Sequence, residues 1–109
     1  MAWRANIYVM ATSGTREPIH PGFVLRTEFL EPLGITAYAL GRAIGVDLRR
    51  VYAIVKEERT ISVDTGLRLS RALGVDQMYW INLQARYDAQ VAAEELTDEL
   101  NSIECLIAK

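Results

Sequence analysis

Cysteine and histidine are almost absent from this 109-residue sequence, which contains one of each. Cys105 has no second cysteine with which to form an internal disulfide, so nothing points to an oxidising compartment. His20 and Cys105 lie near opposite ends of the chain, without the spacing of a metal site or of a nucleophile–base pair. The sequence also has no glycine-rich phosphate loop. We therefore expect no enzymatic activity, no metal and no cofactor.

Long apolar runs are missing too. No stretch approaches the roughly 18 apolar residues that a membrane helix needs. The first ten residues are too polar for a secretory signal. These absences favour a cytoplasmic protein with no membrane partner. Residues 1–18 show no sustained period, and residues 11–18 are rich in turn formers. Residues 1–18 are therefore expected to be a loop-like N-terminal extension, in which Met10 is an alternative start.

The sequence has no excess of positive charge: 12 Lys and Arg stand against 14 Asp and Glu, a net charge of −2. A protein that coats nucleic acid without sequence preference would be strongly basic, so that class is excluded. The charge is uneven, with eight basic and six acidic residues in 1–60 but four and eight in 61–109. Nucleic acid, if bound, is expected at the first half of the chain.

Proline and glycine are scarce, with three and seven residues in a chain that is 50% hydrophobic. This balance favours an all-α domain with a buried core. Apolar residues at helical spacing, with start and stop signals around them, predict five core helices. The first begins at Pro21 and ends at Pro32, and the others follow the caps Thr36, Asp47, Ser62 and Asp76. A further C-terminal helical segment carries Leu96, Leu100, Ile103 and Ile107.

Residues 37–56 match the pattern of two short helices joined by a tight turn, the helix-turn-helix. Gly41 is the small residue needed where the helices cross, and Gly45 supplies the positive φ of the turn. Because a glycine inside a helix costs about 1 kcal/mol relative to alanine, a packing constraint would explain Gly41. The inner face of both helices is apolar: Leu40, Ile44, Val46, Val51 and Ile54.

This register determines which side chains of the second helix face outward. An arginine there can donate two hydrogen bonds to guanine in the major groove. The expected base contacts are Leu48, Arg49, Arg50 and Tyr52. The expected phosphate contacts are Thr36, Ala37, Arg42, Lys56 and Arg59. The alternative for the two adjacent arginines is that they simply form a solvated helix face. Because acidic residues lie nearby, a monomer is not expected to bind DNA strongly without regard to sequence.

Several blocks between Ile19 and about Val91 resemble the HigA-type antitoxins, a branch of the Xre/Cro-type helix-turn-helix proteins that includes the VapI-like virulence-associated proteins. Besides the helix-turn-helix, these blocks are residues 19–22 (Ile-His-Pro-Gly), 28–34, 61–65, 68–74 and 80–88. Phe23 departs from the family, which usually has an acidic residue there, and Gly66 stands where alanine is usual. The resemblance implies a λ-repressor-like domain over 19–91, with its helix-turn-helix at about 36–56, and a C-terminal helical segment over 92–109.

The resemblance also implies the partners. They are double-stranded operator DNA with an inverted repeat and a HigB-type toxin, a RelE-like mRNA endonuclease. The protein would repress its own operon as a homodimer, which is expected physically because one helix-turn-helix reads few base pairs. The expected dimer or partner contacts are Trp80, Tyr87, Leu96, Leu100, Ile103 and Ile107. For Trp80 and Tyr87, ordinary core packing is an equal alternative. The toxin is expected to meet the acidic residues Glu94, Glu95, Asp98 and Glu99.

Two other functions fit the same residues. A stand-alone Xre-family regulator without a toxin would use the same DNA-contacting side chains. An adjacent gene for a small basic protein would favour the antitoxin instead. A helix-turn-helix module that binds only proteins would show no affinity for DNA, even at low salt.

Overall fold

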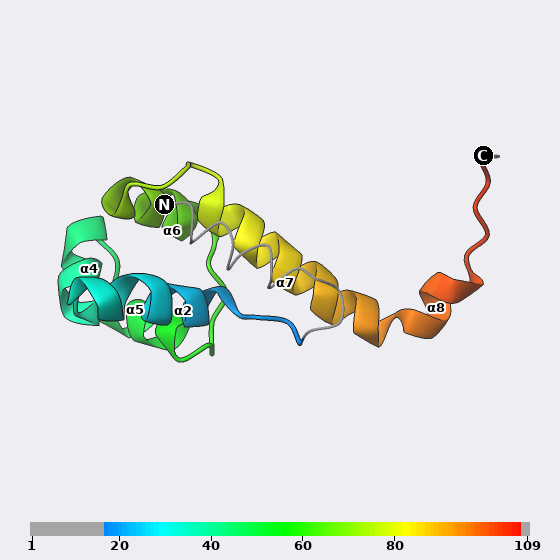
Figure 1. The fold of residues 1–109 in the computed structure, drawn as a ribbon, viewed down its shortest axis with the longest axis horizontal. Coiled ribbons are helices and arrows are strands. Elements are labelled where there is room, and N and C mark those ends of the chain that lie inside the picture. Colours follow the sequence, from blue (N-terminus) through cyan, green and yellow to red (C-terminus); the bar gives the residue numbers. More distant parts are fainter. Residues whose placement is uncertain (1–16, 108–109) are drawn as a thin grey trace.

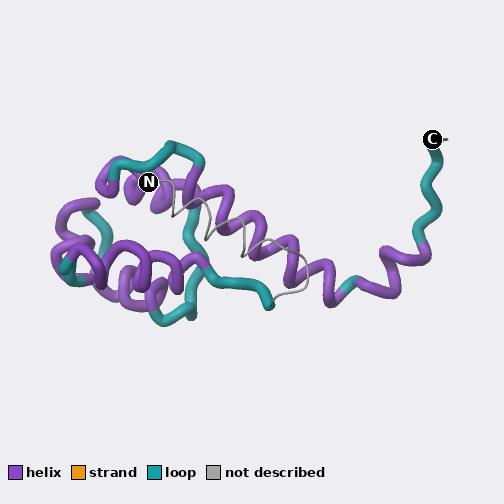
Figure 2. Tube along the Cα trace, in the orientation of Figure 1, coloured by secondary structure: helices purple, strands orange, loops and turns teal. Residues whose placement is uncertain are grey.

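The computed structural model describes residues 17–107, and every regular element within them is helical (Figures 1 and 2). α2, η1 and α3 follow one another without a break and form one helical rod. Counted with this rod, the described residues contain the five core helices and the additional C-terminal helix that the sequence predicts. The expected extension 1–18, with its alternative start, lies outside the described residues except for its last two. The elements are α2 (Pro21–Val24), η1 (Leu25–Leu30), α3 (Glu31–Leu33), α4 (Ala37–Ile44), α5 (Leu48–Val55), α6 (Val63–Leu73), α7 (Tyr79–Glu95) and α8 (Thr97–Ser102).

The first rod differs from the uniform helix expected between Pro21 and Pro32, because its middle part, η1, is a π-helix. Pro32 has no N–H, and its ring would clash with the carbonyl four residues earlier in an α-helix. The wider π turn relieves this clash, and the N–H of Glu31 donates to the carbonyl of Arg26, five residues back. The rod begins as predicted, with Pro21 in its first turn and His20 as N-cap.

The core lies between this rod, the α4–α5 pair, α6 and the first half of α7 (Figure 1). Trp80 is at its centre with 0% of its surface exposed, and its ring centroid lies 5.2 Å from that of Phe29. Trp80 as a dimer contact is therefore wrong, and the alternative of core packing holds. Tyr87 is half-buried, with its ring 5.0 Å from the imidazole of His20. The buried apolar residues are Val24, Leu25, Phe29, Leu30, Leu40, Ile44, Val51, Ile54, Ile61, Leu69, Trp80 and Leu83.

α7 begins at Tyr79, slightly later than the cap Asp76 suggests. Asp76 instead closes a turn, because its Oδ2 accepts from the N–H of Met78 at 2.9 Å and its carbonyl accepts from Tyr79 at 3.0 Å. The second half of α7 projects away from the other helices, and α8 lies at the far end (Figure 1). No helix among residues 17–107 combines the length and hydrophobicity that a membrane crossing needs.

The C-terminal helix is shorter than expected, since α8 ends at Ser102. Ile103 and Ile107 lie beyond it, so the predicted helical spacing through Ile107 is wrong. Leu96, Leu100 and these two isoleucines are between 44% and 76% exposed. A helix this short gains little without a packed face, because most helical stability in proteins comes from tertiary contacts.

Candidate nucleic-acid interface

The helix-turn-helix forms where the sequence predicts it. Gly45 ends α4 with φ of 71°, and Asp47 caps α5. A Cβ on Gly41 would lie 3.1 Å from the carbonyl oxygen of Val46, so the turn packs closely against this glycine. The inner residues Leu40, Ile44, Val51 and Ile54 are each at most 6% exposed, and Val46 packs against them. The two helices therefore form a rigid pair.

The outward face of α5 carries Arg49, Tyr52 and Lys56, which recur at intervals of three and four residues and are all exposed. The side chain of Arg49 is 93% exposed, and Tyr52 is 46% exposed. Leu48 and Arg50 are half-buried at the edges of this face, and the Nε of Arg50 is enclosed. Of the four predicted base contacts, Arg49 and Tyr52 thus have the direct outward position.

Asp47 restrains Arg49 in the free protein. The Oδ1 of Asp47 accepts from the backbone N–H of Arg49 at 2.7 Å and lies 3.4 Å from its Nε. Hydrogen bonds from the side chain and the backbone of Arg49 lower the pKa of the Asp47 carboxyl. The carboxylate therefore caps α5 and also forms an exposed ion pair with the Arg49 side chain.

The predicted phosphate contacts surround this face. The Oγ1 of Thr36 caps α4 by accepting from the N–H of Ala39 at 3.0 Å, so the first turn of α4, beginning at Ala37, has a fixed direction. Arg42 is exposed on the same helix. Lys56 ends α5 and Arg59 lies in the following connector, both exposed.

Sequence reasoning missed Tyr38, which is 53% exposed beside Arg42 on α4. The hydroxyl of Tyr38 accepts from Nη1 of Arg42 at 3.2 Å, and the guanidinium lies 5.8 Å from the centroid of the ring. The tyrosine therefore orients the arginine. The spacing of four residues on a helix is the signal that could have identified this pair.

Comparison with known proteins identifies the family of this chain. A helix-turn-helix family profile matches residues 27–76. Virulence-associated protein I of Dichelobacter nodosus is 46% identical over 77 residues, 71% of each chain. Antitoxin HigA-1 of Vibrio cholerae is 36% identical over 73 residues, which cover 67% of this chain and 69% of the relative. The solved structure of the Pseudomonas aeruginosa antitoxin HigA with the higBA promoter is 40% identical. It matches 83% of this chain and 99% of that one with a TM-score of 0.77.

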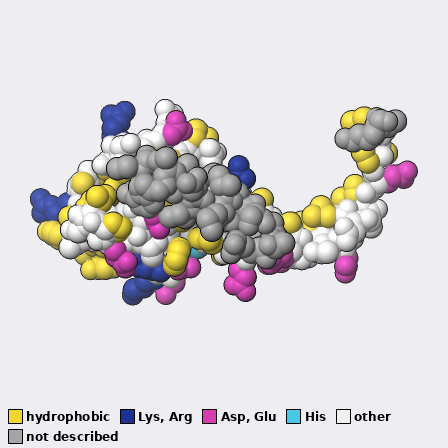
Figure 3. Space-filling view, viewed as in Figure 1, with side chains coloured by type: hydrophobic (Ala, Val, Ile, Leu, Met, Phe, Trp, Pro, Cys, Tyr) yellow, Lys and Arg dark blue, Asp and Glu magenta, His cyan; other side chains and the backbone are white. Residues whose placement is uncertain are grey.

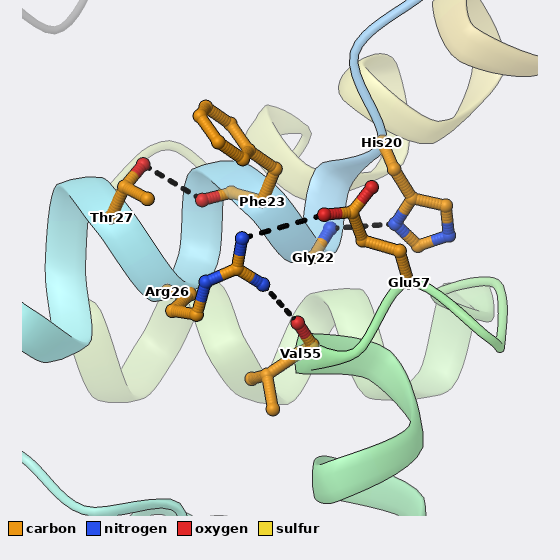
Figure 4. A network of polar contacts seen from close by, with 7 residues as sticks. All are labelled: His20, Gly22, Phe23, Arg26, Thr27, Val55 and Glu57. Atoms are coloured by element: carbon orange, nitrogen blue, oxygen red, sulfur yellow. Dashed lines mark hydrogen bonds and ion pairs between the residues drawn. The ribbon is translucent and has the colours of Figure 1, made fainter.

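The chain belongs to the HigA-type family of helix-turn-helix proteins. In this HigA-type chain, two arginines far away in the sequence bind the C-terminal ends of α4 and α5. Arg68 on α6 donates to the carbonyl of Ile44 at 2.7 Å. Arg26 on η1 donates to the carbonyl of Val55 and to the carboxylate of Glu57 (Figure 4). Cations are favoured at these ends because the helix dipole is negative there. Contacts over 24 and 29 residues leave no local signal in the sequence.

Arg26→Met is expected to lower the free energy of unfolding by about 1–2 kcal/mol. The variant leaves the carbonyl of Val55 without its charged donor, whereas the exposed ion pair with Glu57 contributes little. Urea unfolding of Arg26→Met beside Arg26→Lys measures this, and the lysine should recover part of the loss. Equal stability of the methionine variant and the parent would show that the contact does not hold α5.

The His-Pro-Gly block of the HigA-type sequence joins the first rod to α5 and α7 (Figure 4). The Nδ1 of His20 accepts from the N–H of Gly22 at 2.8 Å, a local hydrogen bond that caps the first turn of the rod. Burial lowers the pKa of His20, while Glu57, Asp88 and a hydrogen bond with the backbone of Arg59 oppose the shift. Below its pKa the imidazole would carry a proton on Nδ1 and could no longer accept this hydrogen bond.

The free energy of unfolding is therefore expected to fall as the pH is lowered from 7.5 to 5.5. The unfolded chain binds a proton near the ordinary pKa of histidine, about 6.5, before the folded protein does, so acidification favours unfolding. His20→Asn keeps a capping oxygen without this titration, and its urea midpoint should change less over the same range. Asp47 titrates below this window. An equal change in both proteins would remove His20 as the cause.

Proposed function

We propose that this protein is a sequence-specific DNA-binding antitoxin. It would repress its own operon as a homodimer and neutralise a HigB/RelE-like mRNA endonuclease. The observation that carries the proposal is the rigid α4–α5 pair with Arg49 and Tyr52 facing outward. This pair lies in a chain that shares its fold with an antitoxin solved together with promoter DNA.

Recognition would begin with α5 entering the major groove. Arg49 would leave Asp47 and donate two hydrogen bonds to guanine, while Tyr52 would contact a thymine methyl group or a phosphate. Leu48 and Arg50 would contact the neighbouring bases from the edges of the helix. The first N–H groups of α4, at Thr36 and Ala37, have no intrahelical acceptor and would bind a phosphate, as would the side chains of Arg42, Lys56 and Arg59.

A homodimer would place two such helices about 34 Å apart, one helical turn of DNA. Its operator would then be an inverted repeat. The exposed apolar residues of the C-terminal part, Leu96, Leu100, Ile103 and Ile107, would supply dimer or partner contacts together with the half-buried Tyr87. Footprinting on DNA upstream of the gene should show two protected half-sites related by two-fold symmetry. A single protected half-site would contradict binding as a dimer.

The toxin would be basic and would bind the acidic C-terminal residues Glu94, Glu95, Asp98 and Glu99, all of which are exposed. Co-expression with the neighbouring gene tests this: the two proteins should co-purify, and ribosome-dependent mRNA cleavage should stop. Reversing the four charges should release the toxin while leaving the helix-turn-helix folded. A toxin complex that survives the reversal would refute these contacts. Operator binding with no toxin to suppress would instead indicate a stand-alone regulator.

A further inference from the structure

A groove of about 750 Å³ lies between the C-terminal half of α4 and α6, and none of its lining residues belongs to α5. Its apolar lining includes Ile44, Leu67 and Val75, and its rim carries the basic side chains of Arg68 and Arg71. Arg68 is already bonded to Asp64 and to the carbonyl of Ile44, and Arg71 is exposed. The groove therefore suits a segment that is both apolar and acidic.

The C-terminal tail of this chain, residues 94–107, has this composition. It contains five acidic residues and no Lys or Arg. Figure 3 shows acidic and hydrophobic side chains along this projecting end. Between 44% and 93% of the surface of each large apolar residue of the tail is exposed. These apolar residues are Leu96, Leu100, Ile103, Leu106 and Ile107.

The tail cannot reach the groove of its own molecule in this structure. α7 has 17 residues, a length of about 26 Å, and carries the chain away from α4 and α6 (Figure 1). The groove and α8 lie at opposite ends of a molecule whose longest dimension is 51 Å. A tail that fills the groove must come from another molecule.

We propose that the tail of one molecule docks in the Arg68–Arg71 groove of a second copy. When both tails are exchanged, the contact is reciprocal and closes a two-fold dimer. The acidic residues of the tail face Arg71 at the rim, and its apolar residues cover Leu67 and Val75. The groove uses Ala43 and Ile44 of α4, whereas Gly41 faces α5, so a docked tail leaves Arg49 and Tyr52 free for DNA. The inference rests on the homodimer of the proposed function and names its contact.

Cross-linking tests this arrangement, because Cys105 is the only cysteine and lies exposed in the tail. Ala72→Cys adds a second thiol at the groove, and Ala85→Cys adds one on the exposed face of α7 as a control. After treatment with a short bis-maleimide, mass spectrometry of Ala72→Cys should find peptides joining position 72 to Cys105. The control should not join position 85 to Cys105. Products that join only Cys105 to Cys105 would overturn the proposal, since the tails would then pair with each other.

Charge reversal gives a second test on the full chain. Arg71→Glu should raise the dimer dissociation constant at least tenfold in sedimentation experiments, while Arg86→Glu on α7 should change it less than twofold. An equimolar mixture of Arg71→Glu with Asp98→Lys/Glu99→Lys should regain dimers, because both docking contacts of the mixed dimer then pair opposite charges. An unchanged dimer dissociation constant in Arg71→Glu would overturn the docking of the tail but not the proposed function. A parent protein that is monomeric and does not bind its operator would instead overturn the proposed function.

Discussion

Arg49→Ala is expected to weaken operator binding by roughly 10- to 100-fold, since a bidentate arginine–guanine contact contributes about 1–3 kcal/mol to base discrimination. Arg49 is the most outward basic side chain of α5, 93% exposed, and its removal leaves the helix-turn-helix core intact. Gel-shift titration with the operator and with a scrambled duplex distinguishes a base contact from a phosphate contact. Loss of a base contact reduces the preference for the operator, whereas loss of a phosphate contact weakens both complexes alike.

Arg86→Ala is the matched control, because it removes the same charge from α7. Its operator affinity should stay within about twofold of the parent. Arg50→Ala should have a smaller effect on selectivity than Arg49→Ala, because Arg50 is half-buried at the edge of the recognition face. An Arg49→Ala variant with unchanged selectivity would remove Arg49 from the base contacts and move recognition to the neighbouring side chains.

Gly22→Ala is expected to lower the free energy of unfolding by about 3 kcal/mol, at the upper end of the usual cost of overpacking. A Cβ at this position would lie 1.8 Å from the carbonyl oxygen of Ile54 and 2.8 Å from its carbon. Both are backbone atoms of α5, so the start of the first rod must move away from α5. The melting temperature should fall by about 10–20 °C in circular dichroism.

Gly66→Ala is the control for this prediction. Its Cβ would meet only side-chain atoms, with the Cγ1 of Ile81 nearest at 3.3 Å, and alanine is the better helix former. Stability should stay within about 1 kcal/mol of the parent. If Gly22→Ala were as stable as Gly66→Ala, the close approach of the rod to α5 would not exist in solution.

The helix-turn-helix could be predicted from sequence because its determinants are local. Gly41, Gly45 and the caps Thr36 and Asp47 act within a few residues of their own positions, and the structure has them in those roles. Outward exposure on α5 follows from the same helical register. For this reason the sequence could place Arg49 and Tyr52 on the exposed face of α5.

The errors arose where distant contacts decide the structure. The apolar spacing of α7 does not tell whether Trp80 faces the core or a partner, and packing against Phe29 decides this. The contacts of Arg26 with Val55 and of Gly22 with Ile54 span about thirty residues and follow no period. In the tail, regular apolar spacing favours a longer helix, but no neighbouring element among residues 17–107 packs on its exposed residues to stabilise one.

The most direct test of the account is a fluorescence-anisotropy titration of the protein against a labelled duplex from immediately upstream of its gene, beside a scrambled duplex. At physiological salt the upstream duplex should bind at least about 1,000-fold more tightly, and its affinity should fall steeply as salt increases. Equally negligible binding to both duplexes at low salt would contradict sequence-specific DNA binding. The exposed face of α5 would then have to serve a protein partner instead.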